Sequence, residues 1–206
     1  DKIYLFTLLI ISILLSFLIV KNFSSNFLIN TILISSAFYL FFITLRDFFI
    51  KGFKNLAQNI AHFGFSLLIL SILFNSLFSS EIITNLKVGQ TFENKKAKIV
   101  FESISQKEAK NYRSIIGNFT VQDSKGKIEN LSPELRIYNQ PNITTSEADI
   151  KTTLLSDKFI VINIVQNQEF FNVRYQVKPF MLWIWISVIL ISFGGLISFL
   201  KKGYEK

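Results

Sequence analysis

The chain has 206 residues, half of them hydrophobic, and it carries a formal net charge of +8 without a single cysteine. The lack of cysteine excludes disulfides, thiolate nucleophiles, zinc fingers and iron–sulfur ligation by this sequence. The positive charge does not indicate nucleic-acid binding, because the basic residues outside the central polar segment flank long apolar runs, as they do in membrane proteins.

Four segments without Asp, Glu, Lys or Arg dominate the sequence: 3–20, 22–45, 55–80 and 179–200. A helix needs about 20 residues to cross the hydrocarbon core of a bilayer, and each segment is close to or above that length. We therefore expect a polytopic α-helical membrane protein with four transmembrane helices. The first segment is longer than the roughly 7–15-residue core of a signal peptide and no small-residue cleavage site follows it, so it too is predicted to span.

The distribution of basic residues predicts the orientation of these helices. The loop between the second and third segments holds three of them, Arg46, Lys51 and Lys54. A basic tail, "KKGYEK", follows the fourth segment, whereas the loop between the first two segments holds only Lys21. Because cytoplasmic loops are enriched in Lys and Arg, both termini are expected inside and residues 81–178 outside.

The predicted organisation has four parts along the chain. Residues 1–57 form two transmembrane helices and a short cytoplasmic interfacial loop around "RDFFIKGF" (46–53). Residues 58–80 form the third transmembrane helix, and residues 81–178 form a β-rich extracytoplasmic domain inserted between the third and fourth helices. Residues 179–206 form the fourth helix and a basic cytoplasmic tail.

The inserted segment has the composition of strands rather than helices. "AKIVFESI" (97–104), "GNFTVQD" (117–123) and "KFIVINIVQ" (158–166) are rich in β-branched and aromatic residues. "FFNVRYQV" (170–177) alternates strictly, which places four side chains on one face: Phe171, Val173, Tyr175 and Val177. The expected fold is a small β-sandwich or β-barrel.

Two stretches of this segment are predicted to be irregular. "LSPELRIYNQPN" (131–142) has the composition of a connection. "TTSEADI" (144–150) contains Glu147 and Asp149, but two carboxylates are too few for a calcium loop. We therefore predict a solvated loop there.

His62 is the only histidine, and it lies eighth in the third apolar segment, one to two helical turns from the predicted cytoplasmic surface. A helical wheel places it in a polar stripe with Asn55, Gln58, Asn59, Ser66, Ser76 and Ser80. Polar groups are costly in hydrocarbon, so the stripe is expected to face other helices or a cofactor. Neutral imidazole suits iron, copper or zinc, with Gln58, Asn59 or Ser66 orienting the ring. The alternative is that His62 only hydrogen-bonds a neighbouring helix.

A single histidine does not complete a metal site. Met181, the only methionine, lies at the outer end of the fourth apolar segment, across the membrane from His62. Any second ligand is therefore expected from outside this chain.

The fourth apolar segment carries the ordinary marks of a transmembrane helix. Trp183 and Trp185 fit an aromatic belt at the outer interface, and Lys201 with the adjacent lysine marks the inner end. The pair Gly194 and Gly195 is predicted to allow close approach of another helix.

Together, "NIAHFGFS", "KNYRSIIGNFTV", "LSPELRIYN", "TTSEADI" and "VRYQVKPFMLWIWISVILISFGGL" resemble the C-terminal part of the CcmF family, the haem lyase component of system I cytochrome c maturation. The resemblance runs from about Asn55 to the C-terminus, in the family's order and spacing. It implies that His62 is an axial ligand of a haem b held in the membrane. It also implies a β-domain on the periplasmic side of a bacterial inner membrane, or on the outer face of the mitochondrial inner membrane.

The resemblance further implies a set of partners and a reaction. In the family, haem b passes electrons toward a second haem that arrives on a haem chaperone, and that haem is attached through thioethers to an apocytochrome c. The expected partners are the haem chaperone, the subunits that handle apocytochrome c, and the remainder of a CcmF-type protein or a split partner subunit.

The sequence departs from the family pattern in what it lacks. The family's tryptophan-rich haem-handling motif, the histidines that flank it and the partner ligand of haem b have no counterpart, since this chain has two tryptophans and one histidine. We expect a fragment, a truncated chain or a separately encoded piece that does not attach haem by itself. The main alternative is a subunit of an export or lipid-transport permease with an extracytoplasmic β-domain. A simple anchor for the β-domain is a second alternative, although one helix would suffice for that.

Overall fold

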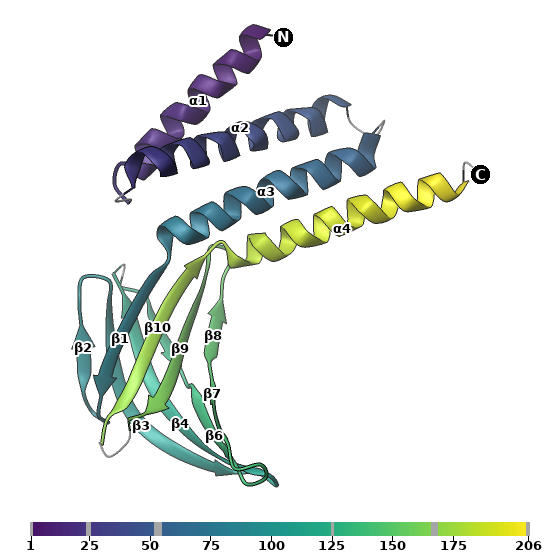
Figure 1. The fold of residues 1–206 in the computed structure, drawn as a ribbon. Helices are drawn as coiled ribbons and strands as arrows, with labels where there is room; N and C mark the ends of the chain where they lie inside the picture. The colour runs from purple at the N-terminus through teal and green to yellow at the C-terminus, as the bar shows by residue number, and fades with distance from the viewer. Residues whose placement is uncertain (1, 24–25, 52–54, 125, 166–168, 205–206) are drawn as a thin grey trace. The chain divides into compact units, whose positions relative to one another are not determined.

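The computed structural model describes residues 2–23, 26–51, 55–124, 126–165 and 169–204, and this part of the chain forms four helices and ten strands (Figure 1). The helices are α1 (Lys2–Val20), α2 (Phe27–Lys51), α3 (Leu56–Phe78) and α4 (Met181–Tyr204). The strands, all between α3 and α4, are β1 (Ser80–Leu86), β2 (Thr91–Glu93), β3 (Ala97–Glu108), β4 (Tyr112–Asp123), β5 (Ile128–Leu131), β6 (Glu134–Tyr138), β7 (Thr144–Glu147), β8 (Asp149–Thr152), β9 (Ser156–Ile164) and β10 (Phe171–Pro179).

The chain divides into two compact units. The helical unit comprises Asp1–Ser79, Leu154–Ser156 and Pro179–Lys206, and the sheet unit comprises Ser80–Thr153 and Asp157–Lys178. A short loop from the middle of the strands thus belongs to the helical unit.

All four helices are long and apolar enough to cross a membrane, which confirms the expected helix content. The helix α2 continues through Arg46 to Lys51. The described part of "RDFFIKGF" is therefore the end of α2 and not a separate segment, while its last two residues lie outside the described residues. The apolar and aromatic composition of "RDFFIK" simply extends the preceding helical pattern.

The contact between α2 and α3 combines phenylalanine rings with one buried polar pair. Phe38 and Phe74 meet edge to face, with ring centroids 5.6 Å apart, and Phe41 lies 5.6 Å from Phe63. Between these rings, the hydroxyl oxygens of Thr44 and Ser66 are 2.7 Å apart. A hydrogen bond of this kind between helices contributes about 0.6 kcal/mol in membranes, so the rings supply most of the attraction.

Small residues hold α3 and α4 close together in antiparallel order. A Cβ atom on Gly194 would lie 2.7 Å from the carbonyl oxygen of Ala57 and 2.8 Å from the amide nitrogen of Ala61. A Cβ atom on Gly64 would lie 2.9 Å from Cβ of Leu190. Backbones that approach this closely maximise van der Waals contact between membrane helices. A Cβ atom on Gly195 would meet no described atom within 4 Å apart from its own stretch of helix, so the predicted close contact is confirmed for Gly194, whereas Gly195 makes none with the described helices.

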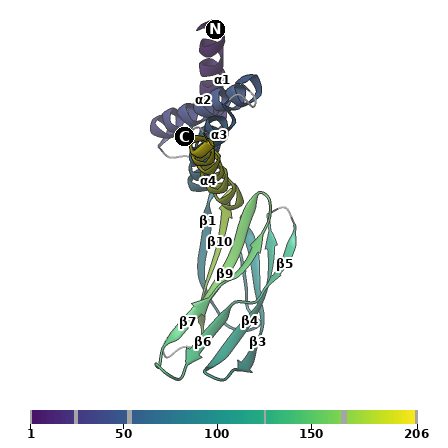
Figure 2. The ribbon, with the colours of Figure 1, turned by 90° about the vertical axis from the view of Figure 1, so that its right-hand side faces the viewer.

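The strands form a sandwich of two sheets (Figure 2). One sheet has the order β1-β10-β9-β8, and the other has the order β2-β3-β4-β6-β7 with β5 paired to β4. Inward side chains from both sheets form one core, in which Phe101 stacks on Phe119 at 4.3 Å and meets Phe171 of the opposite sheet edge to face at 5.5 Å. This arrangement confirms a sandwich rather than a barrel.

The strand β10 confirms the alternation seen in the sequence. Val173 and Tyr175 are buried in the core, and Phe171 and Val177 pack against it. β10 pairs along its length with β1. Burial of one of its faces fixes which of its alternating side chains enter the core. Strands at 97–104, 117–123 and 158–164 are likewise confirmed within β3, β4 and β9, while residue 165 follows the end of β9 and residue 166 lies outside the described residues.

The two stretches predicted to be irregular are largely strands. Within 131–142, β6 pairs with β4 on one side and β7 on the other, and Leu135 is fully buried. Within 144–150, β7 pairs with β6, and β8 begins directly afterwards and pairs with β9 of the other sheet. Their polar composition predicts loops, but backbone pairing with neighbouring strands decides the structure, since edge strands tolerate polar side chains.

A buried ion cluster lies inside the sheet unit. The ammonium group of Lys158, which is 8% exposed, donates hydrogen bonds to Asp123 at 3.0 Å and to Glu129 at 3.1 Å. Glu129 also pairs with Lys127 at 2.7 Å. Burial lowers the pKa of Lys158, but the hydrogen bonds with the two carboxylates outweigh it and leave the pKa above its ordinary value.

Candidate functional site

One face of α3 is left exposed by the other described helices. Six exposed side chains follow one another at spacings of three, four or seven residues along this face: Asn55, Gln58, His62, Phe65, Ile72 and Ser76. Spacings of three, four and seven keep residues on the same side of a helix. We call this set the outer face of α3. Its members are polar near the start of the helix and apolar in its middle.

His62 lies on this outer face with its imidazole accessible. Within the described part of the chain, no hydrogen bond, ion pair or ring contact engages it. Neutral imidazole has one donor and one acceptor nitrogen, and a polar group left without a partner in hydrocarbon costs several kcal/mol. A membrane-embedded His62 therefore needs a partner from outside the four helices.

The predicted polar stripe divides into two halves in the structure. Asn59 and Ser66 lie directly beside the outer face but are buried, and the Ser66 hydroxyl is engaged by Thr44 and by the carbonyl oxygen of Phe63 at 2.8 Å. Of the three residues predicted to orient the imidazole, only Gln58 shares the outer face with His62. A wheel gives the angle of each residue but not which arc is covered by neighbouring helices, so the single stripe was too broad.

The start of α3 and the end of α4 enclose a recess of about 410 Å³. Its lining is Asn55, Leu56, Ala57, Gln58, Ile197, Ser198 and Lys201. Asn55 and Gln58 belong both to this recess and to the outer face. Polar side chains therefore continue from His62 back to the start of α3. In the sequence, Lys201 is far from Asn55 and Gln58, and no local pattern connects it to them. The antiparallel packing of α3 and α4 makes that connection.

Met181 does not share a site with His62. Gly64 packs against Leu190 and Ile191, so His62 lies level with the middle of α4, whereas Met181 is its first residue. At 1.5 Å per residue, this places Met181 roughly 15 Å farther along the helix axis. Among the described residues, no three His, Cys, Asp or Glu side chains gather as a metal site. A metal bound by His62 would therefore need further ligands from outside the described residues.

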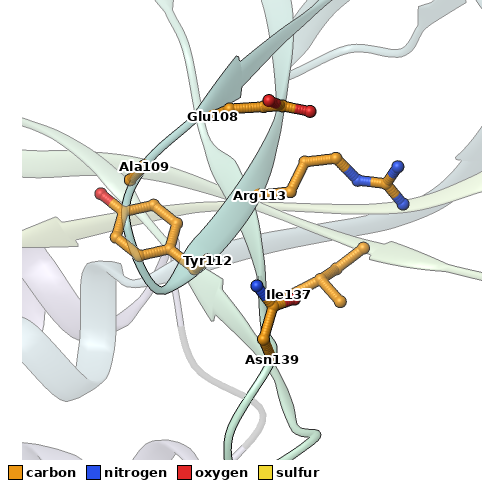
Figure 3. Close-up of a pocket in the computed structure, with 6 residues that line it drawn as sticks. All are labelled: Glu108, Ala109, Tyr112, Arg113, Ile137 and Asn139. Carbon is orange, nitrogen blue, oxygen red and sulfur yellow. The ribbon is translucent and has the colours of Figure 1, made fainter.

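The sheet unit has a recess of its own, which the sequence did not single out. It measures about 400 Å³ and is lined by Glu108, Ala109, Tyr112, Arg113, Ile137 and Asn139. Glu108 and Arg113 face each other in the β3–β4 register, and Figure 3 shows both side chains extending to the same side, with Tyr112 on the other. The guanidinium of Arg136 lies 5.2 Å from the Tyr112 ring. The recess contains no nucleophile beside a base, so this geometry offers no catalytic constellation.

The amino-acid sequence and the fold both match proteins of known families. Residues 77–179, half of the chain, match a family model described as the CcmF C-terminal beta-sandwich. This chain belongs to the CcmF family. The matched segment begins at the end of α3 and covers the whole sandwich up to Pro179, the last residue of β10.

Relatives in several bacteria carry names from cytochrome c biogenesis. The CcmF protein of Pseudomonas fluorescens is 29% identical over 161 residues, which cover 76% of this chain and 24% of that protein. The biogenesis protein ccl1 of Rhodobacter capsulatus is 32% identical over 119 residues, covering 58% of this chain and 18% of that protein. This chain thus spans about a quarter of the length of the curated relatives it matches. None of these matches supports the permease hypothesis.

A solved structure has the same fold. A protein titled "Cytochrome c Heme Lyase CcmF" superposes with a TM-score of 0.70 at 16% identity, over 95% of this chain and 34% of that one. The arrangement of four helices and an inserted sandwich therefore occurs in the CcmF fold, and the present chain is similar to about one third of it.

Proposed function

We propose that this chain is the C-terminal part of a cytochrome c maturation haem lyase, in which His62 supplies one axial ligand to a membrane-embedded haem b. The carrying observation is that the only histidine lies exposed on the outer face of α3, without a partner in the described chain, in a member of the CcmF family. The names of the relatives support a role in cytochrome c maturation. The accessible imidazole of His62 supports haem b as the cofactor.

The residues around His62 fit a haem. The imidazole is accessible, Gln58 lies one turn before it and can accept a hydrogen bond from the ring nitrogen that does not bind iron, and Phe65 and Ile72 extend the face as apolar surface for a macrocycle. A haem b in this place would supply a one-electron redox centre within the membrane. His62 would hold the neutral tautomer, with one nitrogen on the iron and the other fixed by its neighbour.

The proposed haem site requires a second axial ligand. Since the outer face of α3 is covered by no other described helix of this chain, the second axial ligand would come from a helix of the remaining CcmF-type protein or of a split partner subunit. Haem attachment itself would involve the haem chaperone and apocytochrome c, and it would use residues that are not in this sequence. This chain alone is not proposed to be catalytic.

The proposed location is a bacterial inner membrane or the mitochondrial inner membrane. The basic ends of α2 and α4 would lie in the cytoplasm or matrix by the positive-inside rule, with the sheet unit on the periplasmic or intermembrane side. The family membership supports a multi-pass membrane protein, and the lysines and arginine at these two helix ends support the orientation.

The His62→Ala variant is expected to lose the low-spin b-type signal in a reduced-minus-oxidised visible spectrum of the protein purified with its accompanying segments or subunits. Alanine removes one of the two strong-field axial ligands, which a six-coordinate low-spin iron needs. Ser76→Ala, which lies on the same outer face, is the matched control and should keep the spectrum. An unchanged spectrum in His62→Ala would refute ligation by this residue.

A further inference from the structure

The loop between β8 and β9 is attached to the first turn of α4. Trp183 donates its indole N–H to the carbonyl oxygen of Leu154 at 2.8 Å, and the backbone N–H of Phe180 donates to the carbonyl oxygen of Leu155 at 2.9 Å. These contacts explain why Leu154–Ser156 belongs to the helical unit although strands flank it on both sides. The two carbonyls are satisfied by the helix, so the loop has a fixed position at its end.

The ends of α3 and α4 are themselves joined at this level. The side-chain amide of Asn75 donates to the carbonyl oxygen of Pro179 at 2.6 Å, and the rings of Phe74 and Phe180 lie 5.3 Å apart. Phe180 adopts a positive φ of 60°, a strained conformation for a non-glycine residue. The turn that positions the loop is therefore held by contacts on both helices.

The side chains of this loop are apolar and uncovered. Leu154 is 70% exposed and Leu155 is 66% exposed, and no charged residue lies between Lys151 and Asp157. Burying a leucine side chain stabilises a protein by about 1.5–3 kcal/mol, so two adjacent exposed leucines on a fixed backbone leave a substantial gain unused within this chain.

The loop lies level with the aromatic end of a helix that can span a membrane. Trp183 and Trp185 occupy the first two turns of α4, and tryptophan at the end of such a helix typically marks the boundary between headgroups and hydrocarbon. Trp185 is 62% exposed, and the exposed residues Val188 and Ile189 continue this surface along the helix. The leucines thus lie level with the tryptophan-marked end of α4, held there by the hydrogen bond to Trp183.

We propose that Leu154 and Leu155 insert into the lipid at the membrane boundary and form a second, non-spanning contact between this chain and the bilayer. Lipid is the occupant because the loop is uncharged, apolar and fixed to Trp183, at the tryptophan-marked end of α4. The proposal rests on α4 spanning the membrane and does not depend on haem binding, so it stands or fails separately from the proposed function.

Site-directed spin labelling tests this directly, since the sequence has no cysteine of its own. A label on Leu155→Cys is introduced into the protein purified with its accompanying segments or subunits, with any cysteines in those replaced, and reconstituted in bilayers. The label should collide preferentially with oxygen, which concentrates in lipid, over a water-soluble nickel chelate. An independent label on Leu154→Cys should give the same preference.

Two reference positions make the result decisive. A label on Phe193→Cys, at an exposed position near the middle of α4, provides the lipid reference. A label on Ile128→Cys, at an exposed position on β5, provides the water reference. At both leucine positions, the ratio of collisions with oxygen to collisions with the nickel chelate is expected to be closer to that at Phe193 than to that at Ile128. Preference for the nickel chelate would place the loop in water, and protection from both reagents would place it against another protein segment. Either result overturns the proposal.

Discussion

Replacing Lys158 with alanine is expected to destabilise the sandwich by about 3 kcal/mol. The substitution removes the buried cation that pairs with both Asp123 and Glu129, while Glu129 keeps its ion pair with Lys127. Breaking a buried ion pair costs about 3–5 kcal/mol, and the lower end applies because the Asp123 side chain keeps 23% of its exposure and retains some hydration.

Pulse proteolysis in urea on the intact protein measures this loss of stability. Lys151→Ala is the matched control, because Lys151 lies directly opposite Lys158 in the β8–β9 register but is exposed. The control is expected to change the unfolding free energy by less than about 0.5 kcal/mol. If Lys158→Ala lowered the unfolding free energy no more than Lys151→Ala does, the buried ion cluster would not be stabilising.

The same cluster predicts how stability depends on pH. Burial raises the pKa of Glu129, but hydrogen bonds from Lys127 and Lys158 outweigh it and leave the pKa below its ordinary value of 4.5. The stability contributed by Glu129 is therefore complete above pH 4.5 and is lost as the pH falls through the lowered folded-state value. The difference between wild type and Lys158→Ala should accordingly shrink in acid.

Gly194→Val is expected to separate α3 from α4. The atoms that a side chain would meet are the backbone of Ala57 and Ala61, at 2.7 and 2.8 Å, and backbone cannot move aside as a flexible side chain can. Overpacking of this kind costs about 1–3 kcal/mol, and a branched side chain falls at the upper end. Because Ala61 precedes His62, the distortion should also weaken the proposed haem site.

Gly195→Val is the matched control for this substitution. The chemical change and the effect on helix propensity are the same, but Gly195 is exposed, and an added Cβ would meet no atom of another described element within 4 Å. Thermal stability in detergent, followed by size-exclusion chromatography, should drop for Gly194→Val and stay near wild type for Gly195→Val. Loss of stability in both variants would point to the helix backbone rather than to the α3–α4 contact.

The helices and the long strands could be predicted because their patterns are strong and local. Uncharged runs of about 20 residues have few alternatives to a membrane helix. The alternation from Phe171 to Val177 likewise predicts which face of β10 enters the core. By contrast, β6, β7 and β8 are short and polar, and their structure depends on partners far away in the sequence, such as β4 and β9. No local pattern reports such pairing.

The candidate site was predicted in part for a similar reason. The helical wheel correctly placed Gln58 and His62 together, because their angle depends only on helix geometry. It could not separate them from Asn59 and Ser66, since that division depends on where α2 and α4 pack. Gly195 shows the same limit: two adjacent glycines look equal in sequence, and only the position of α3 distinguishes them.

The central claim is that the His62 imidazole binds haem iron directly, and rescue of a His62→Gly variant by free imidazole tests it most directly. Glycine leaves a space in which imidazole from solution can take the place of the side chain. The account predicts that His62→Gly loses the low-spin b-type spectrum and that millimolar imidazole restores it, as imidazole should not do for Gly194→Val. A low-spin spectrum that persists in His62→Gly without imidazole would contradict the account, because the ligand would then be another residue.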